Sequence, residues 1–79
     1  MIPNKGDPIE ITCGDRVVDG VMGIISENCI SAIIYFDAML DGHVGAMPLM
    51  AETSTDAARG IYRSLITGTE VMIRKKQNA

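Results

Sequence analysis

The chain has 79 residues, of which 47% are hydrophobic and 22% charged, so it is one small globular domain and not a disordered protein. Its formal net charge of −3 argues against a protein built mainly to hold nucleic acid or an anionic membrane surface. A chain below about 80 residues rarely builds a core worth more than about 3–5 kcal/mol, so a disulfide, a metal or a partner subunit is expected to add stability.

A partner subunit is the expected source of that extra stability. The chain starts Met1-Ile2-Pro3-Asn4, without the basic and apolar regions of a secretory signal, which predicts a cytoplasmic protein with reduced thiols at Cys13 and Cys29. One histidine and two distant cysteines form no metal-ligand cluster, so we expect no metal and no cofactor. No apolar run approaches the length of a membrane span.

The β-branched residues Ile, Val and Thr account for 21 of the 79 positions, while leucine occurs three times. Such residues pack well on pleated sheets, so the composition favours an all-β fold. After an irregular lead-in over residues 1–7, the pattern predicts strands at 9–13 and 16–26. Asp19-Gly20, inside the second strand, is either a hairpin turn or a bulge.

The next predicted hairpin is the clearest in the sequence. A strand over 29–40 is followed by the turn Asp41-Gly42 and a strand over 43–50. A two-residue turn would pair Leu40 with His43 and Phe36 with Met47. Pro48 cannot donate to a ladder, which places it at an edge or near the end of its strand.

The second half of the chain is predicted to hold one helical turn and a last hairpin. Thr53 or Ser54 could cap a turn within 54–60 that Gly60 ends. A strand over 61–66, a turn over 67–69, a strand over 70–74 and a flexible basic tail over 75–79 follow, and a helix over 57–65 is the alternative. The whole chain then forms one antiparallel five- or six-stranded SH3-like barrel, with an OB-type barrel or an α+β fold with a short helix at 54–60 as alternatives.

Both faces of the 29–50 hairpin are apolar, although only one can face the core of so small a domain. Alternation places Ile34, Phe36 and Met47 on one face. Monomers rarely expose large apolar areas, so we expect the other face to be an oligomer interface, with a dimer favoured. That face carries Ile33, Tyr35, Met39, Val44, Ala46 and Met50.

His43 is the weak candidate for catalysis, because it alone titrates near neutral pH. Asp41 or Asp37 in the same hairpin could orient it as a general acid or base. The alternative, which we favour, is an exposed turn histidine without a chemical role. Cys13 and Cys29 lie beside acidic or neutral residues and are expected to be packing residues.

The basic residues near the C-terminus form a second weak candidate site. Residues 1–40 carry a net charge of −4 and residues 41–79 a net charge of +1. Arg59, Arg63 and Arg74 could therefore form a basic face for an anionic ligand, although a solvated strand is the commoner explanation.

Two stretches resemble known families. Ile9-x-Ile11-x-x-Gly14, Val17, Gly20-x-Met22 and Ile24-Ile25 resemble the first part of an Sm-type SH3-like barrel. The resemblance implies barrel geometry, but Met72-Ile73-Arg74 is followed by lysine where the RNA-binding motif of that family has glycine. The stretches 36–49 and 62–71 resemble small bacterial proteins without an assigned activity, among them cargo proteins of mobile integron gene cassettes. This second resemblance implies a bacterial cytoplasmic protein.

The function predicted from the sequence is that of a small self-associating binding or interaction module. The alternative is a small enzyme in which two subunits build a shared cleft around His43. Weak binding of nucleic acid through Arg59, Arg63 and the tail ranks third, because single-strand binders use aromatic platforms and this chain has few aromatic residues. A small ligand or a second protein is the other class of partner that this module would bind.

Overall fold

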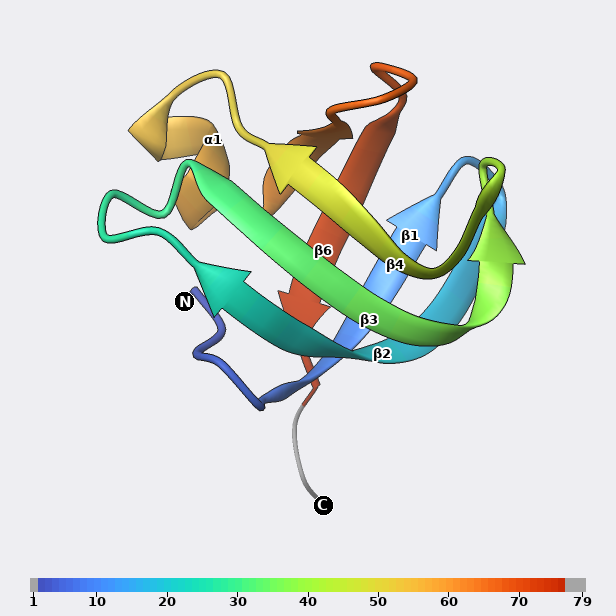
Figure 1. Cartoon of the computed structure of the whole chain (residues 1–79). Coiled ribbons are helices and arrows are strands. Elements are labelled where there is room, and N and C mark those ends of the chain that lie inside the picture. The colour runs from blue at the N-terminus through green and yellow to red at the C-terminus, as the bar shows by residue number, and fades with distance from the viewer. Residues whose placement is uncertain (1, 77–79) are drawn as a thin grey trace.

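A computed structural model describes residues 2–76 and shows an all-β protein (Figure 1). Each strand pairs antiparallel with its neighbour in the sequence, and the last strand returns to the first, which closes a six-stranded barrel. The predicted SH3-like or OB-type barrel size is confirmed. The elements are β1 (Pro8–Cys13), β2 (Arg16–Ile25), β3 (Ser31–Leu40), β4 (His43–Met50), α1 (Ser54–Ala58), β5 (Ile61–Ser64) and β6 (Glu70–Lys75).

The core follows from alternation along the strands, because successive side chains point to opposite sides of a sheet. β1 places Ile9 and Ile11 inside, β3 places Ile34 inside and β4 places Met47 and Leu49 inside, all fully buried. These side chains meet inside the barrel in one cluster. Residues 2–7 form no helix or strand, and the amide of Gly6 joins them to β2 by donating to the Met22 carbonyl at 2.8 Å.

The second strand is continuous where a turn or a bulge was predicted at Asp19-Gly20. Asp19 pairs with Glu10 and Gly20 with Ile9 in an unbroken register. A Cβ atom on Gly20 would lie 2.4 Å from the Tyr35 carbonyl oxygen, so the glycine allows β2 and β3 to approach closely. The bulge comes after Met22, where the register against β3 shifts by one residue.

The hairpin of β3 and β4 turns at Asp41-Gly42 as predicted, and Leu40 pairs with His43. The predicted pairing of Phe36 with Met47 is wrong, because Met47 pairs with Ile34. Three residues of β3, 36–38, lie opposite Gly45 alone, whose φ of +79° suits a bend. A shift of two residues returns each side chain to its original face, so the predicted inner and outer faces remain.

Two strand ends differ from the prediction because polar side chains turn the chain. β3 starts at Ser31, not at residue 29, since Cys29 adopts a φ of +63° and the amide of Ile30 donates to Asn28 Oδ1. β5 ends at Ser64, not at residue 66, because Ser64 Oγ accepts the amide hydrogens of Ile66 and Thr67, each at 3.2 Å.

The short helix α1 forms as the polar stretch predicted. Thr53 is its N-cap and accepts the amide of Asp56 at 3.1 Å, and Gly60 follows its end with a φ of +77°. Its buried Ala57 joins the barrel core, so α1 lies against one end of the barrel (Figure 1). The predicted tail begins one residue later than expected because Lys75 belongs to β6, and residues 77–79 lie outside the described residues.

Candidate functional site

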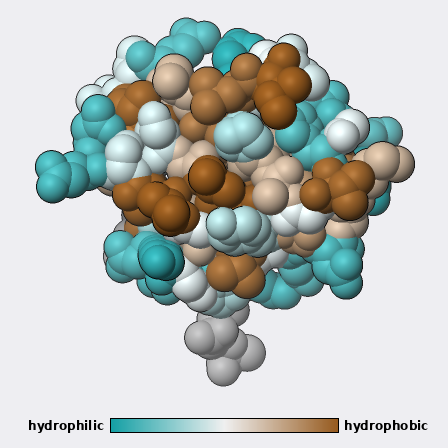
Figure 2. Space-filling model, viewed as in Figure 1, coloured by the Kyte–Doolittle hydropathy of each residue, from teal (hydrophilic) through white to brown (hydrophobic). Residues whose placement is uncertain are grey.

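The predicted interface residues lie together on the outside of β3 and β4, and we call this surface the β3–β4 outer face. Val44 is 76% exposed and Met39 is 60% exposed, and these two residues pair directly across the hairpin. Figure 2 shows brown, hydrophobic areas across the side of the barrel that presents β3 and β4, with paler side chains between them. The face comprises Ile33, Tyr35, Met39, Val44, Ala46 and Met50, of which Ile33 and Ala46 are half-buried and the others exposed.

The β3–β4 outer face is almost free of charge. Asp37 is the only Asp, Glu, Lys or Arg in these two strands. The ion pairs found within residues 2–76 lie on the other strands and the loops next to them, and they are Arg63–Glu52, Arg74–Glu10, Lys75–Asp7 and Lys76–Asp19. The Arg74–Glu10 pair lies on β1 and β6, across the barrel from β3 and β4. Two arginines border the β3–β4 outer face, since Arg63 pairs with Met50 and Arg16 donates to the Met39 carbonyl.

The ring of Tyr35, within this face, lies over Gly23 of β2, which has no side chain. A Cβ atom built on Gly23 would lie 2.5 Å from Cε2 of Tyr35, so the ring occupies the space that any other residue would need. Tyr35 also pairs with Val21 on one side and Ala46 on the other. A partly exposed tyrosine presents both an apolar ring and a polar hydroxyl on this face.

His43 is buried, with 8% of its surface exposed, so the favoured prediction of an exposed turn histidine is wrong. Its Nδ1 lies 3.0 Å from the Asp41 carbonyl oxygen and 3.3 Å from that of Leu40. A carbonyl oxygen can only accept, so we assign the imidazole proton to Nδ1. Nε2 is then an acceptor for the hydroxyl of Ser64, which is 3.1 Å away.

Ser64 and His43 share a hydrogen bond like that of a catalytic nucleophile and its base, but a substrate could not reach the serine hydroxyl. Ser64 is 3% exposed, and its Oγ also accepts the amides of Ile66 and Thr67. Both lone pairs of the hydroxyl are therefore used, and no lone pair faces solvent for attack. The hydrogen bond between these two side chains instead joins β4 to the turn after β5. Sequence reasoning missed Ser64, because nothing local relates it to a histidine 21 residues away.

The predicted carboxylate partners of His43 lie elsewhere. The Asp41 carboxylate accepts the hydroxyl of Thr67, which joins the β3–β4 turn to the β5–β6 turn. Hydrogen bonds from Thr67 and Thr69 lower the pKa of Asp41 below its ordinary value, with a smaller contribution from His43. Asp37 is exposed on β3, and no side-chain hydrogen bond joins it to His43 within residues 2–76. The structure therefore does not assemble the three predicted catalytic residues into one acid–base site.

The lowered pKa of Asp41 predicts how stability depends on pH. A carboxyl group whose pKa is lower in the folded state contributes stability above its ordinary pKa and loses it as the pH falls through the lowered value. From pH 7 to pH 3, the wild-type protein should therefore lose more unfolding free energy than Asp41→Asn. Asparagine tolerates the φ of +50° at this position, so the substitution keeps the turn. Urea unfolding at both pH values measures the difference, and equal losses would show that Asp41 is not involved.

The cysteines fit the predicted packing role better than a catalytic one. Cys13 is buried in the core cluster, and burial raises the pKa of its thiol, with the charge of Asp41 adding to the effect. A raised pKa keeps the thiol protonated and unreactive. Cys29 is half-buried in the β2–β3 loop, where its carbonyl accepts the Tyr62 hydroxyl at 2.7 Å. Burial raises the pKa of that hydroxyl, so Tyr62 stays a donor to this loop.

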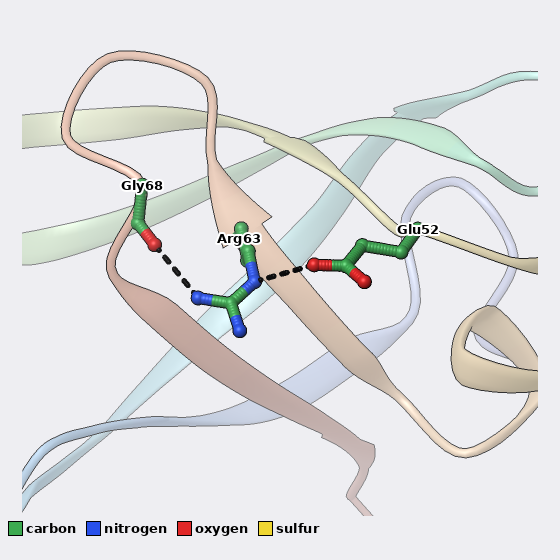
Figure 3. A network of polar contacts seen from close by, with 3 residues as sticks. All are labelled: Glu52, Arg63 and Gly68. Carbon is green, nitrogen blue, oxygen red and sulfur yellow. Dashed lines mark hydrogen bonds and ion pairs between the residues drawn. The ribbon is translucent and has the colours of Figure 1, made fainter.

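The three predicted anion-binding arginines separate into two groups. Arg63 is occupied, since its Nε donates to Glu52 at 3.0 Å and its guanidinium donates to the Gly68 carbonyl at 3.1 Å (Figure 3). Arg59 and Arg74 instead border the same hollow of about 280 Å³ on the outside of β1 and β6. Sequence reasoning could not separate them, because both groups are exposed basic residues in the same half of the chain.

Within residues 2–76 no cluster of three or more His, Cys, Asp or Glu side chains could hold a metal ion. Among those residues, no helix has the length and apolar character that crossing a membrane requires. Comparisons find no matching protein-family model, no similar curated protein and no similar solved structure. The resemblance to integron cassette proteins stays a prediction.

Proposed function

We propose that this protein is a small binding module that works as a homodimer, joined through the β3–β4 outer face. The observation that carries the proposal is that four exposed apolar side chains share the outer side of two neighbouring strands in which Asp37 is the only Asp, Glu, Lys or Arg. These side chains are Tyr35, Met39, Val44 and Met50. Exposed apolar side chains gathered on two neighbouring strands are typical of an interaction site.

The second copy is the partner that this face suits best. A standard interface buries about 800 Å² on each partner, about one sixth of the 4878 Å² surface of this chain. In a dimer with twofold symmetry the same patch meets itself, so a nearly uncharged surface matches its partner without an opposite charge pattern.

Two lysines in the face test the proposal. Met39→Lys with Val44→Lys should turn the dimer into a monomer, because four charges would be brought into one apolar contact. Both side chains are well exposed in the single chain, so the barrel itself should remain folded. Native mass spectrometry of the untagged protein gives the assembly mass against the 8.5 kDa chain, and circular dichroism checks the fold.

A matched control places the same charges on the opposite wall of the barrel. Val17 is 58% exposed and Met72 is 46% exposed, and both pair with Thr12 of β1, one from each side. Val17→Lys with Met72→Lys should leave the dimer intact. A wild-type monomer, a dimeric Met39→Lys/Val44→Lys variant or a monomeric control would each contradict the proposal.

The hydrogen bonds of His43 disfavour the alternative of an enzyme with a cleft shared between two subunits. A shared catalytic cleft would require His43 to leave its bonds to Ser64 and the backbone when the dimer forms. The cytoplasmic location predicted from the sequence is kept as part of this proposal.

A further inference from the structure

The wall of the barrel opposite the β3–β4 outer face carries a hollow that the proposed dimer does not use. Its floor is the outer surface of β1 and β6, where Thr12 pairs with Met72 and Glu10 with Arg74. Its rim is the end of α1 and the residues that follow it, including Arg59. The hollow has a volume of about 280 Å³, just below the size range of pockets that take drug-sized ligands. Its occupant would therefore be a smaller molecule.

The charge of the hollow is opposite to that of the protein. The chain as a whole has a net charge of −3, but the hollow is lined by Arg59, Arg74 and Lys75 against the single carboxylate of Glu10. The lining residues therefore sum to +2, and to +1 once Asp7, the ion-pair partner of Lys75, is included. Clustering of one sign of charge in a concave surface raises the local concentration of oppositely charged solutes. An anion is the ligand class that such a surface attracts.

The state of each cation shows where an anion would bind. Arg74 contacts one oxygen of Glu10 at 2.7 Å, and Lys75 lies 3.4 Å from Asp7. Arg59 forms no ion pair within the described part of the chain, so its guanidinium keeps all its donors for a ligand. Exposed ion pairs such as Arg74–Glu10 contribute little to stability, so Arg74 can share its donors with an incoming oxyanion.

An apolar side chain lies beside these donors. Met72 is 46% exposed, and its polarizable thioether adapts to irregular ligand surfaces. Thr12 next to it adds a hydroxyl that can donate or accept. We propose that this hollow binds a small amphipathic anion, in which a carboxylate or phosphate head contacts Arg59 and Arg74 and a short apolar body lies on Met72.

Titration with simple probes tests this site on the wild-type protein. Hexanoate and monobutyl phosphate should each shift the backbone amide signals of the hollow, Ala58 to Gly60 and Met72 to Lys75, in nitrogen–proton correlation spectra. Acetate and inorganic phosphate lack the apolar body and should bind at least fivefold more weakly, and neutral hexanol should leave these signals in place. A stronger response to hexanoate or to monobutyl phosphate identifies the head group as carboxylate or phosphate.

Two substitutions test separately how the anionic head and the apolar body of the ligand contribute to binding. Arg59→Gln should weaken hexanoate binding at least tenfold, and Arg63→Gln, whose arginine is occupied elsewhere, should leave it unchanged (Figure 3). Met72→Gln should remove the preference for hexanoate over acetate. Equal binding of hexanoate and acetate, equal losses in Arg59→Gln and Arg63→Gln, or no shift with any probe would overturn the proposal. The site is independent of the proposed dimer, since it lies on the opposite wall.

Discussion

Replacing Gly60 with alanine is expected to lower the free energy of unfolding by about 2–5 kcal/mol, the sum of a left-handed backbone penalty and a steric clash. Gly60 has a φ of +77°, and a Cβ atom there would lie 2.0 Å from the Ile73 carbonyl oxygen. That oxygen is backbone and cannot rotate away. Gly60 also accepts the amide of Ile73 at 2.8 Å, so a shift would strain the junction of α1 with β6.

Gly68 supplies the matched control for this substitution. Its φ is also +77°, but nothing lies within 4 Å of a Cβ built on it. Gly68→Ala should therefore carry only the backbone penalty, about 1–2 kcal/mol. Urea unfolding of both variants isolates the clash as the difference between them. Equal destabilisation of the two variants would show that the contact with Ile73 relaxes without cost.

Ser64→Ala is expected to lower the free energy of unfolding by about 2–3 kcal/mol, because several hydrogen bonds lose one partner at the same time. The hydroxyl donates to His43 Nε2 and accepts the amides of Ile66 and Thr67. The histidine is buried, so its Nε2 would remain without a donor. The role of Ser64 is therefore structural: its hydroxyl connects β4 to the turn after β5 by hydrogen bonds.

A double-mutant cycle with His43→Phe measures the bond between the two side chains. Phenylalanine fills a similar volume without a polar atom, so the loss from Ser64→Ala should be smaller in the His43→Phe background. Ser54→Ala, at an exposed position of α1, should change stability little. Strictly additive losses at positions 43 and 64 would show that the two side chains are not coupled.

The strands and their faces could be predicted from the sequence because their causes are local. Alternation along 29–50 assigned Ile34 and Met47 to the core and Val44 to the surface, and the pleat of a strand gives each residue its side whatever its partner. Asp41-Gly42 gave the turn, since its backbone angles suit these residue types. Of the two predicted helix caps, Thr53 and Ser54, the structure uses Thr53, whose side chain accepts the amide of Asp56.

The register of the central hairpin could not be predicted, because it depends on how the barrel closes. A flat hairpin would keep the pairing of Phe36 with Met47 that the turn implies. Closing six strands requires a sharp bend in β3 and β4, and the extra residues opposite Gly45 supply it. The inner and outer faces were nevertheless correct, since the register shifts by an even number of residues.

Whether the candidate site residues meet was decided by contacts between distant parts of the chain. His43 looks like a surface residue beside a turn, and only the arrival of Ser64 and Thr67 from another hairpin buries its surroundings. Arg59 and Arg74 line one hollow, but Arg63 turns to Glu52, and no local pattern separates these three arginines.

The sequence by itself determined the all-β class, most strand positions and the apolar character of the outer face, because side-chain periodicity and turn chemistry act over a few residues. The tertiary structure alone decided the bulges, the burial of His43 and the place where positive charge gathers on an acidic protein. These features depend on which strands become neighbours when the barrel closes, and that is a property of the whole chain.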